Sequence, residues 1–200
     1  MNNLRLAIFS SHSGSNFQSI IDAIKEGRLD AEIACLITNN SNAYCIERAK
    51  ANNIPYRHIS SVTHPIQSDY EKALLDTLIE FKVNLIVLAG YMKMIPSSII
   101  QAYKNRILNI HPALLPKFGG KGMYGINVHK AVLEAGEKFS GATVHIVDEI
   151  YDHGRILNQM QVEVMPNDTP ESLAQRVLEV EHQLYPLTLQ LIAENKIQLD

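Results

Sequence analysis

The residues best suited to chemistry are an amide and an imidazole two positions apart, Asn109 and His111, at the end of an apolar run. The run predicts a buried strand over residues 106–111, which Pro112 ends. Side chains two positions apart on a strand share one face. Ligands bind at the carboxyl ends of strands in an open parallel sheet. Because an imidazole can carry a proton near neutral pH, we expect a reaction site here.

A later turn, residues 148–154, carries three carboxylates, Asp148, Glu149 and Asp152, and one of them could complete this site. Acidic residues in a turn are usually solvated, so a functional role requires one of them to fold back towards His111. There its charge would raise the pKa of the imidazole and hold its orientation. His145 lies in a predicted strand over residues 143–147, and a plain half-buried strand residue is slightly favoured over a supporting role.

A polar loop over residues 11–16, Ser-His-Ser-Gly-Ser-Asn, joins the first predicted strand to a helix. Backbone N–H groups and hydroxyls at a helix N-terminus suit a phosphate. The loop contains neither Gly-x-Gly-x-x-Gly nor Gly-Lys-Ser/Thr, which disfavours dinucleotides and nucleoside triphosphates. A plain turn in which Asn16 caps the helix is equally compatible with these residues.

A second candidate binding loop follows the predicted strand over residues 85–90, where Gly90 permits a sharp turn. Met92, Met94 and Ile95 then provide an adaptable apolar wall with backbone groups suited to the edge of a flat ligand. A loop that simply folds onto the core would have the same composition.

Strand-like and helical segments alternate through residues 4–111, which predicts right-handed βαβ units and an open, doubly wound, mostly parallel α/β sheet with helices on both faces. The predicted strands are 4–9, 31–38, 54–59, 85–90, 106–111, 143–147 and 156–164, and the predicted helices are 16–27, 43–52, 68–81, a short one from Pro96, 128–135 and 170–195. We expect one domain over residues 1–200. Residues 1–110 would form its phosphate-binding half, and residues 111–200 its catalytic loops, extra strands and C-terminal helix.

The composition is that of an ordinary globular chain: 200 residues, 46% apolar, 20% charged and a net charge of -3. The absence of a basic stripe disfavours nucleic acid, and no apolar run approaches the ~20 residues of a membrane span. The first residues lack the features of a signal peptide, so we expect a cytoplasmic protein. Eight histidines and two cysteines without metal-ligand spacing predict no metal site, and no Gly-x-Ser-x-Gly elbow is present.

The motifs together resemble the folate-dependent formyltransferase superfamily, and within it the members that formylate glycinamide ribonucleotide. The resemblance rests on Asn109-Ile110-His111-Pro112, Leu114-Leu115-Pro116, Asp152-His153-Gly154, Gly14-Ser15-Asn16, Leu88-Ala89-Gly90-Tyr91-Met92, Thr143-Val144-His145, Glu181-His182 and Tyr185-Pro186, and covers essentially the whole chain. It implies a Rossmann-like fold. It also implies transfer of a formyl group from the co-substrate 10-formyltetrahydrofolate to the amine of glycinamide ribonucleotide, in purine biosynthesis.

The resemblance also assigns roles to particular residues. Catalytic roles fall to Asn109, His111 and Asp152, ribonucleotide contacts to Ser13, Gly14, Ser15, Asn16 and Glu181, and folate contacts to Met92, Lys93, Met94, Ile95, Asn109 and Asp148. The family often has arginine where this chain has Lys93 and near Gln67, and its loop at residues 117–125 is a few residues shorter. The expected partners are the two small substrates, with no nucleic acid and no membrane, in a monomer or homodimer.

The implied reaction is direct attack of the amine on the formyl carbon. Asn109 and protonated His111 would stabilise the oxyanion, at about 3 kcal/mol per donor, and His111 would shuttle protons with a water held by Asp152. A formyltetrahydrofolate hydrolase uses the same three residues but usually carries an additional N-terminal domain. Methionyl-tRNA formyltransferases carry a C-terminal barrel, and sugar-nucleotide formyltransferases share the fold. A non-catalytic nucleotide- or folate-binding module is the alternative from a different class, against which the complete set of three residues argues.

Overall fold

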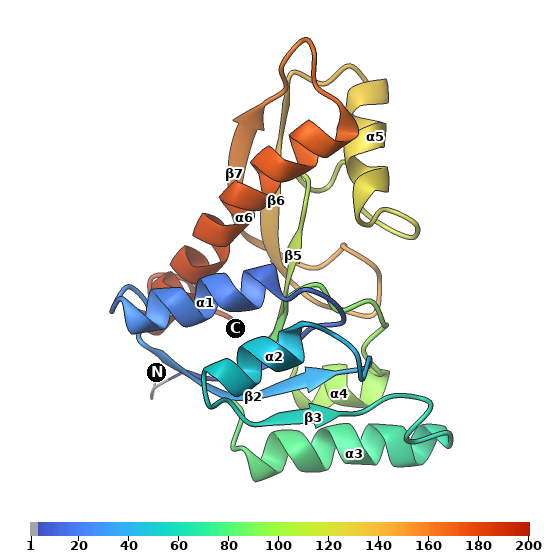
Figure 1. The fold of residues 1–200 in the computed structure, drawn as a ribbon, viewed down its shortest axis with the longest axis vertical. Helices are drawn as coiled ribbons and strands as arrows, with labels where there is room; N and C mark the ends of the chain where they lie inside the picture. The colour runs from blue at the N-terminus through green and yellow to red at the C-terminus, as the bar shows by residue number, and fades with distance from the viewer. Residues whose placement is uncertain (1–3) are drawn as a thin grey trace.

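A seven-stranded sheet in the order β3-β2-β1-β4-β5-β6-β7 runs through the molecule in the computed structural model, which describes residues 4–200 (Figure 1). The strands are β1 (Leu4–Phe9), β2 (Ala31–Thr38), β3 (Tyr56–His58), β4 (Leu85–Leu88), β5 (Ile107–His111), β6 (Phe139–Ile146) and β7 (Ile156–Glu163). The pairings among β1 to β5 are parallel, whereas β5–β6 and β6–β7 are antiparallel. The predicted open, mostly parallel sheet is therefore confirmed. Residues 1–3, which entered the expectation about a signal peptide, lie outside the described part.

Six helices cover the two faces of this sheet within residues 4–200. They are α1 (Ser15–Lys25), α2 (Cys45–Ala51), α3 (Gln67–Glu80), α4 (Ser97–Ala102), α5 (Ile126–Glu134) and α6 (Pro170–Ala193). Alternate side chains of β1 separate the two layers. Leu6 and Ile8 belong to a buried cluster that includes side chains of α1, α2, α5 and α6, while Ala7 and Phe9 belong to a second cluster that includes side chains of α3 and α4. None of the described helices is both long and apolar enough to span a bilayer.

The strand order reverses direction between β1 and β4, because β2 and β3 lie on one side of β1 and all later strands on the other. The loops that leave the carboxyl ends of β1 and β4 therefore diverge above a crevice, which is the usual ligand site of such sheets. β5 ends beside β4, with Asn109 opposite Leu88 in the register. This arrangement brings both predicted binding loops and the Asn109–His111 pair to one edge of the sheet.

The long helix α6 is fixed against that edge by a buried hydroxyl. It begins with a capping box between Thr169 and Ser172. The hydroxyl of Tyr185 lies 3.1 Å from the carbonyl oxygen of Leu88 and 3.0 Å from that of Leu108, to which it donates. Glu181 lies one turn earlier on the same helical face, so this contact also positions its carboxylate.

Candidate active site

The C-terminal end of β5 presents Asn109 and His111 toward β6. The antiparallel register places Asn109 opposite His145 and His111 opposite Thr143. The amide nitrogen Nδ2 of Asn109 lies 3.2 Å from Nε2 of His145. His145 is 2% exposed, so the favoured interpretation of a half-buried strand residue is wrong. The β5–β6 register makes this contact, and the spacing of residues in the sequence does not encode that register.

Asp152 folds back to both imidazoles from the turn between β6 and β7. Its Oδ2 lies 3.5 Å from Nδ1 of His111, and its Oδ1 lies 3.5 Å from Nε2 of His145. Its backbone is in the left-handed region, with φ 54°. The turn thus delivers a carboxylate that is only 11% exposed between two buried rings.

The protonation of this cluster differs from the expectation in one respect. Burial lowers the pKa of His111. The charge of Asp152 raises it, as expected, and so does the carbonyl of Phe118, but the two only partly offset burial and the net shift is downward. Burial raises the pKa of Asp152, but the two imidazoles and the Gly120 N–H outweigh burial, and the net shift is downward. Near neutral pH the cluster therefore holds an ionised carboxylate and a neutral His111.

The proton of neutral His111 is fixed by the main chain. Its Nε2 lies 2.7 Å from the carbonyl oxygen of Phe118, and because a carbonyl only accepts, Nε2 carries the hydrogen. The free lone pair is then at Nδ1, which faces Asp152. His111 can accept a proton at this atom, and the carboxylate would stabilise the resulting imidazolium.

The glycine-rich segment over residues 117–125 forms one wall of this cluster. Besides the Phe118 carbonyl, the N–H of Gly120 donates to Asp152 Oδ2 at 3.0 Å. A Cβ at Gly119 would lie 2.6 Å from the Leu115 side chain and 3.1 Å from Cβ of Asp152. The adjacent glycines permit this close backbone approach, which is the sequence signal that could have placed the loop.

The polar loop after β1 is built around Gly14, which precedes α1 with φ 68° and ψ 37°. A Cβ here would lie 2.7 Å from Cβ of Cys45, so the approach of α2 also requires glycine. Arg48 of α2 donates from Nε to the carbonyl oxygen of Ser13 at 2.8 Å. This cation beside the loop was missed from the sequence, because nothing in residues 43–52 marks which basic side chain faces the loop.

Asn16 lies inside α1 and does not cap it, so the capping alternative is wrong. Its Nδ2 donates to Oε2 of Glu181 at 2.6 Å, across 165 positions of sequence. Both side chains are buried, and Asn16 Oδ1 has no hydrogen-bond partner among the described residues. Burial raises the pKa of Glu181 to about 7, partly offset by the Asn16 hydrogen bond. The structure thus joins two of the predicted ribonucleotide residues in one buried pair.

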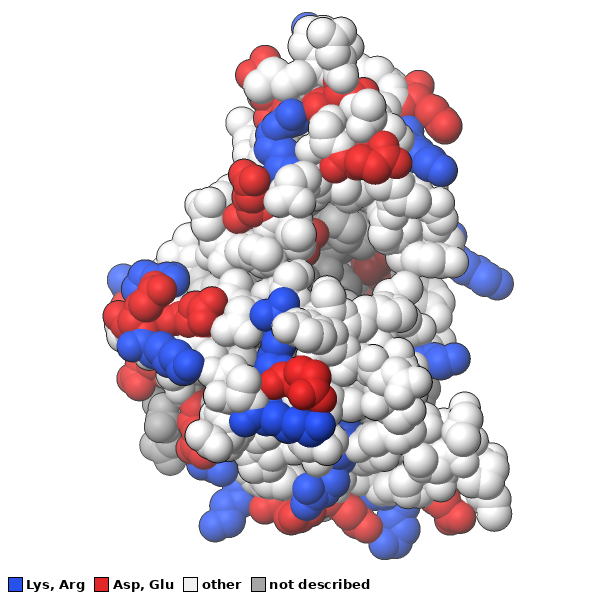
Figure 2. Space-filling view, in the orientation of Figure 1, with Lys and Arg blue, Asp and Glu red and all other residues white. Residues whose placement is uncertain are grey.

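The loop after β4 lines two cavities. The smaller, of about 90 Å³, lies beside the catalytic candidates and is bounded by Asn109, His145, Asp148, Asp152 and Lys93 to Ile95, among others. Met92 lines neither cavity, although its side chain is 45% exposed. The space-filling view shows a hollow between the two halves of the molecule with acidic atoms at its floor (Figure 2).

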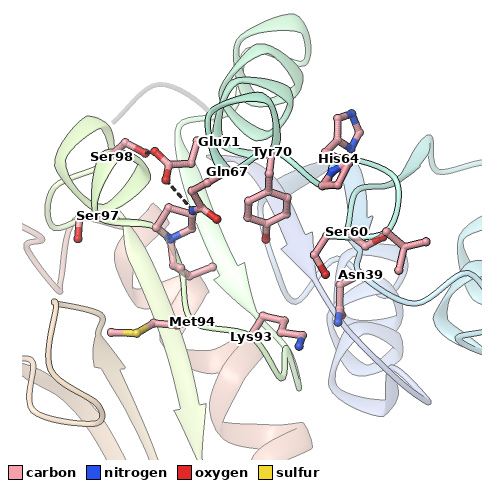
Figure 3. Close-up of a pocket in the computed structure, with 15 residues that line it drawn as sticks. Asn39, Ser60, His64, Gln67, Tyr70, Glu71, Lys93, Met94, Ser97 and Ser98 are labelled. Atoms are coloured by element: carbon pink, nitrogen blue, oxygen red, sulfur yellow. Dashed lines mark hydrogen bonds between the residues drawn. The ribbon is translucent and has the colours of Figure 1, made fainter.

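The larger cavity, of about 760 Å³, lies between the loop after β4 and helices α3 and α4. Lys93 and Asn39 lie on one side of it, and Glu71 lies on the other (Figure 3). Glu71 accepts hydrogen bonds from Ser98 Oγ at 2.6 Å and Gln67 Nε2 at 2.7 Å. The sequence indicated Lys93 but not this pocket, whose lining comes from three separate segments, namely Asn39, residues 60–71 and residues 93–98.

The fold is that of an α/β enzyme with an open, mostly parallel sheet. The candidate active site lies at the carboxyl ends of the strands, where the strand order reverses. Within residues 4–200, no cluster of three or more His, Cys, Asp or Glu side chains is arranged to hold a metal ion. The family model described as formyl transferase matches residues 4–189. The chain belongs to the formyl transferase family.

Three similar proteins illustrate this membership. The chloroplastic phosphoribosylglycinamide formyltransferase of Arabidopsis thaliana is 47% identical over 195 residues, which are 97% of this chain and 67% of that protein. The structure of glycinamide ribonucleotide transformylase 1 from Symbiobacterium toebii matches with TM-score 0.89 and 37% identity over 96% of this chain and 89% of that one. A formyltetrahydrofolate deformylase from Pseudomonas syringae pv. tomato matches with TM-score 0.86 and 25% identity, over 97% of this chain and 62% of that one.

Proposed function

We propose that this chain transfers the formyl group of 10-formyltetrahydrofolate to the amine of glycinamide ribonucleotide, giving the N-formyl product and tetrahydrofolate in purine biosynthesis. The observation that carries the proposal is the position of Asn109, His111 and Asp152. Asn109 and Asp152 line the smaller cavity, and His111 contacts Asp152 at 3.5 Å, at the same sheet edge as the polar loop and Glu181. Similarity to proteins named phosphoribosylglycinamide formyltransferase supports the same reaction.

The polar loop and Glu181 suit the two ends of a ribose phosphate. The N-terminus of α1 offers N–H groups to the phosphate at Ser13 to Asn16, and Arg48 adds a positive charge beside Ser13. A carboxylate such as Glu181 can accept hydrogen bonds from two neighbouring ribose hydroxyls. Its hydrogen bond with Asn16 holds the ribose contact at a fixed distance from the phosphate loop.

The two cavities suit the two ends of the folate. The smaller is lined by apolar Leu88, Ile95 and Val147, with Asp148 at its edge, and suits the flat pterin and the formyl group. The larger would take the aminobenzoyl-glutamate tail, with Lys93 supplying the positive charge for its carboxylates. Met94 and Ile95 line both cavities and would contact the folate where it passes between them.

The reaction needs no nucleophilic side chain. The substrate amine attacks the formyl carbon, and the carbonyl π electrons move to oxygen, where the Nδ2–H of Asn109 donates to the oxyanion. Neutral His111 accepts the proton of the new ammonium at Nδ1, and Asp152 stabilises the imidazolium. The proton then passes to N10 of the folate as the C–N10 bond breaks with its electron pair, and the C=O bond reforms. Each oxyanion donor contributes about 3 kcal/mol by analogy with other oxyanion holes.

The test is formation of tetrahydrofolate by the purified protein with and without glycinamide ribonucleotide. We expect turnover only when both substrates are present, and none in His111→Ala with an unchanged circular dichroism spectrum. If tetrahydrofolate forms at the same rate without the ribonucleotide, the chain would instead be a hydrolase of 10-formyltetrahydrofolate. The similarity to the deformylase is the observation that favours this second candidate. Binding of both ligands without turnover would make the chain a binding module.

The expectations about assembly and compartment belong to the same proposal. We expect a monomer or homodimer that works without nucleic acid, which light scattering during gel filtration would measure. We expect a cytoplasmic location, although the plant relative is named as chloroplastic. A fluorescent fusion would test the location.

A further inference from the structure

The loops after β1 and β4 are joined by one buried residue, Ser11. Its backbone N–H donates to the carbonyl oxygen of Gly90 at 3.0 Å. In return, the N–H of Met92 donates to Oγ of Ser11 at 2.8 Å. Ser11 is 2% exposed and lies at the point where the strand order reverses. A reciprocal pair of hydrogen bonds thus connects the first residue of one loop with residues 90–92 of the other.

The direction of the side-chain bonds is fixed by a third residue. The Ser11 hydroxyl lies 2.6 Å from Oδ1 of Asn39, an oxygen that can only accept, so the single hydroxyl hydrogen is used there. The hydroxyl oxygen must then accept from the Met92 N–H, because a backbone N–H can only donate. Ser11 is therefore occupied on both sides, and its hydroxyl is not free for a phosphate.

Ser11 lies between the two loops that are proposed to bind the substrates. The segment that begins at Ser11 carries the proposed phosphate contacts, and the segment that begins at Met92 carries the proposed folate contacts. A shift of either loop would stretch the hydrogen bond between the Met92 N–H and the buried Ser11 hydroxyl, and losing that bond is unfavourable. Ordering one loop with a ligand therefore also orders the other loop.

We propose that Ser11 is a positioning residue that couples the ribonucleotide site to the folate site, so that each substrate favours binding of the other. The inference rests on the proposed function for the identity of the two ligands. Because coupling between two binding sites is reciprocal, the ribonucleotide would strengthen folate binding by the same factor as folate strengthens ribonucleotide binding.

The test compares Ser11→Ala with Ser10→Ala, a matched deletion of a neighbouring buried hydroxyl. Ser10 is 1% exposed, and its Oγ has no hydrogen-bond partner in the described part of the chain. Calorimetry would measure the affinity for tetrahydrofolate with and without saturating glycinamide ribonucleotide. We expect at least about fivefold tighter binding with the ribonucleotide in the wild type and in Ser10→Ala, and a ratio near one in Ser11→Ala. The KM for 10-formyltetrahydrofolate should rise about tenfold in Ser11→Ala only.

Hydrogen exchange of the Met92 amide provides a readout that does not depend on a variant or on turnover. In the wild type this amide should be protected, and saturating ribonucleotide should slow its exchange further. A wild-type affinity ratio of one, an equal ratio in Ser11→Ala, or Met92 exchange that ignores the ribonucleotide would overturn the inference. Loss of formyl transfer in the wild type would instead overturn the proposed function, while the exchange measurement would still decide whether Ser11 holds Met92.

Discussion

Replacing Glu181 by glutamine should make the protein more stable at alkaline pH and worse at binding its ribonucleotide. Glu181 is 8% exposed and accepts a hydrogen bond from Asn16. Burial raises its pKa from 4.5 to about 7, so the folded protein binds its proton more tightly than the unfolded chain does. The amide of glutamine keeps an oxygen that can accept from Asn16 Nδ2 and never has to ionise.

The magnitude follows from this shift. Below pH 4.5 the carboxyl of Glu181 is protonated in both states and contributes no difference. Between pH 4.5 and 7 the unfolded chain ionises first, so the wild type loses stability until the folded pKa is passed. A shift from 4.5 to about 7, at 1.36 kcal/mol per unit, corresponds to about 3 kcal/mol. Glu181→Gln avoids this loss, so its advantage should grow from near zero at pH 4 to about 3 kcal/mol at pH 8.

Urea unfolding from pH 4 to pH 8 measures this difference as a change in midpoint at constant slope. Glu179→Gln, which removes the same charge from an exposed position of α6, is the matched control and should show no such growth. The gain in stability of Glu181→Gln should come with a higher KM for glycinamide ribonucleotide, because a neutral amide is a weaker acceptor for ribose hydroxyls than a carboxylate. If the free energies of unfolding of the wild type and Glu181→Gln differed by the same amount at every pH from 4 to 8, the reasoning would be refuted.

Three other substitutions test the remaining parts of the site. Asp152→Asn should lower kcat roughly 100-fold and move the acidic limb of the kcat/KM profile to lower pH, because the charge that opposes the burial effect on the pKa of His111 is removed. An unmoved limb would contradict that coupling. Gly14→Ala should destabilise the fold by about 1–3 kcal/mol in urea, and more than Gly27→Ala, which has a similar positive φ but open space. Lys93→Ala should raise the KM for 10-formyltetrahydrofolate up to about fivefold at low salt, with kcat unchanged; a salt-independent effect would exclude a charge contact.

The sequence predicted those parts of the site that depend on local pattern. The strand ending at His111, the helix that follows Gly14 and the alternation of strands and helices are visible as runs and spacings, and the sheet they imply is confirmed. The boundaries of β6 were less predictable. It begins at Phe139, four residues before the predicted strand, because pairing with β7 extends it through Ser140 and Gly141.

Features that depend on contacts between distant segments were not predictable. His145 meets Asn109 through the β5–β6 register, and Asn16 meets Glu181 through the packing of α1 against α6. The direction of the His111 pKa shift depends on a balance between burial and the nearby carboxylate, and burial depth is not written in local spacing. The family resemblance supplied Asp152 and Glu181 as candidates, but only the folded chain gives their distances.

The fate of the formyl carbon tests the central claim most directly. Purified protein would be incubated with 10-formyltetrahydrofolate labelled in the formyl carbon, together with glycinamide ribonucleotide, and the label would be separated between the ribonucleotide and free formate. We expect nearly all of the transferred label in the ribonucleotide, in an amount equal to the tetrahydrofolate formed, and its loss in His111→Ala. Label released as formate at the same rate with or without the ribonucleotide would contradict the account.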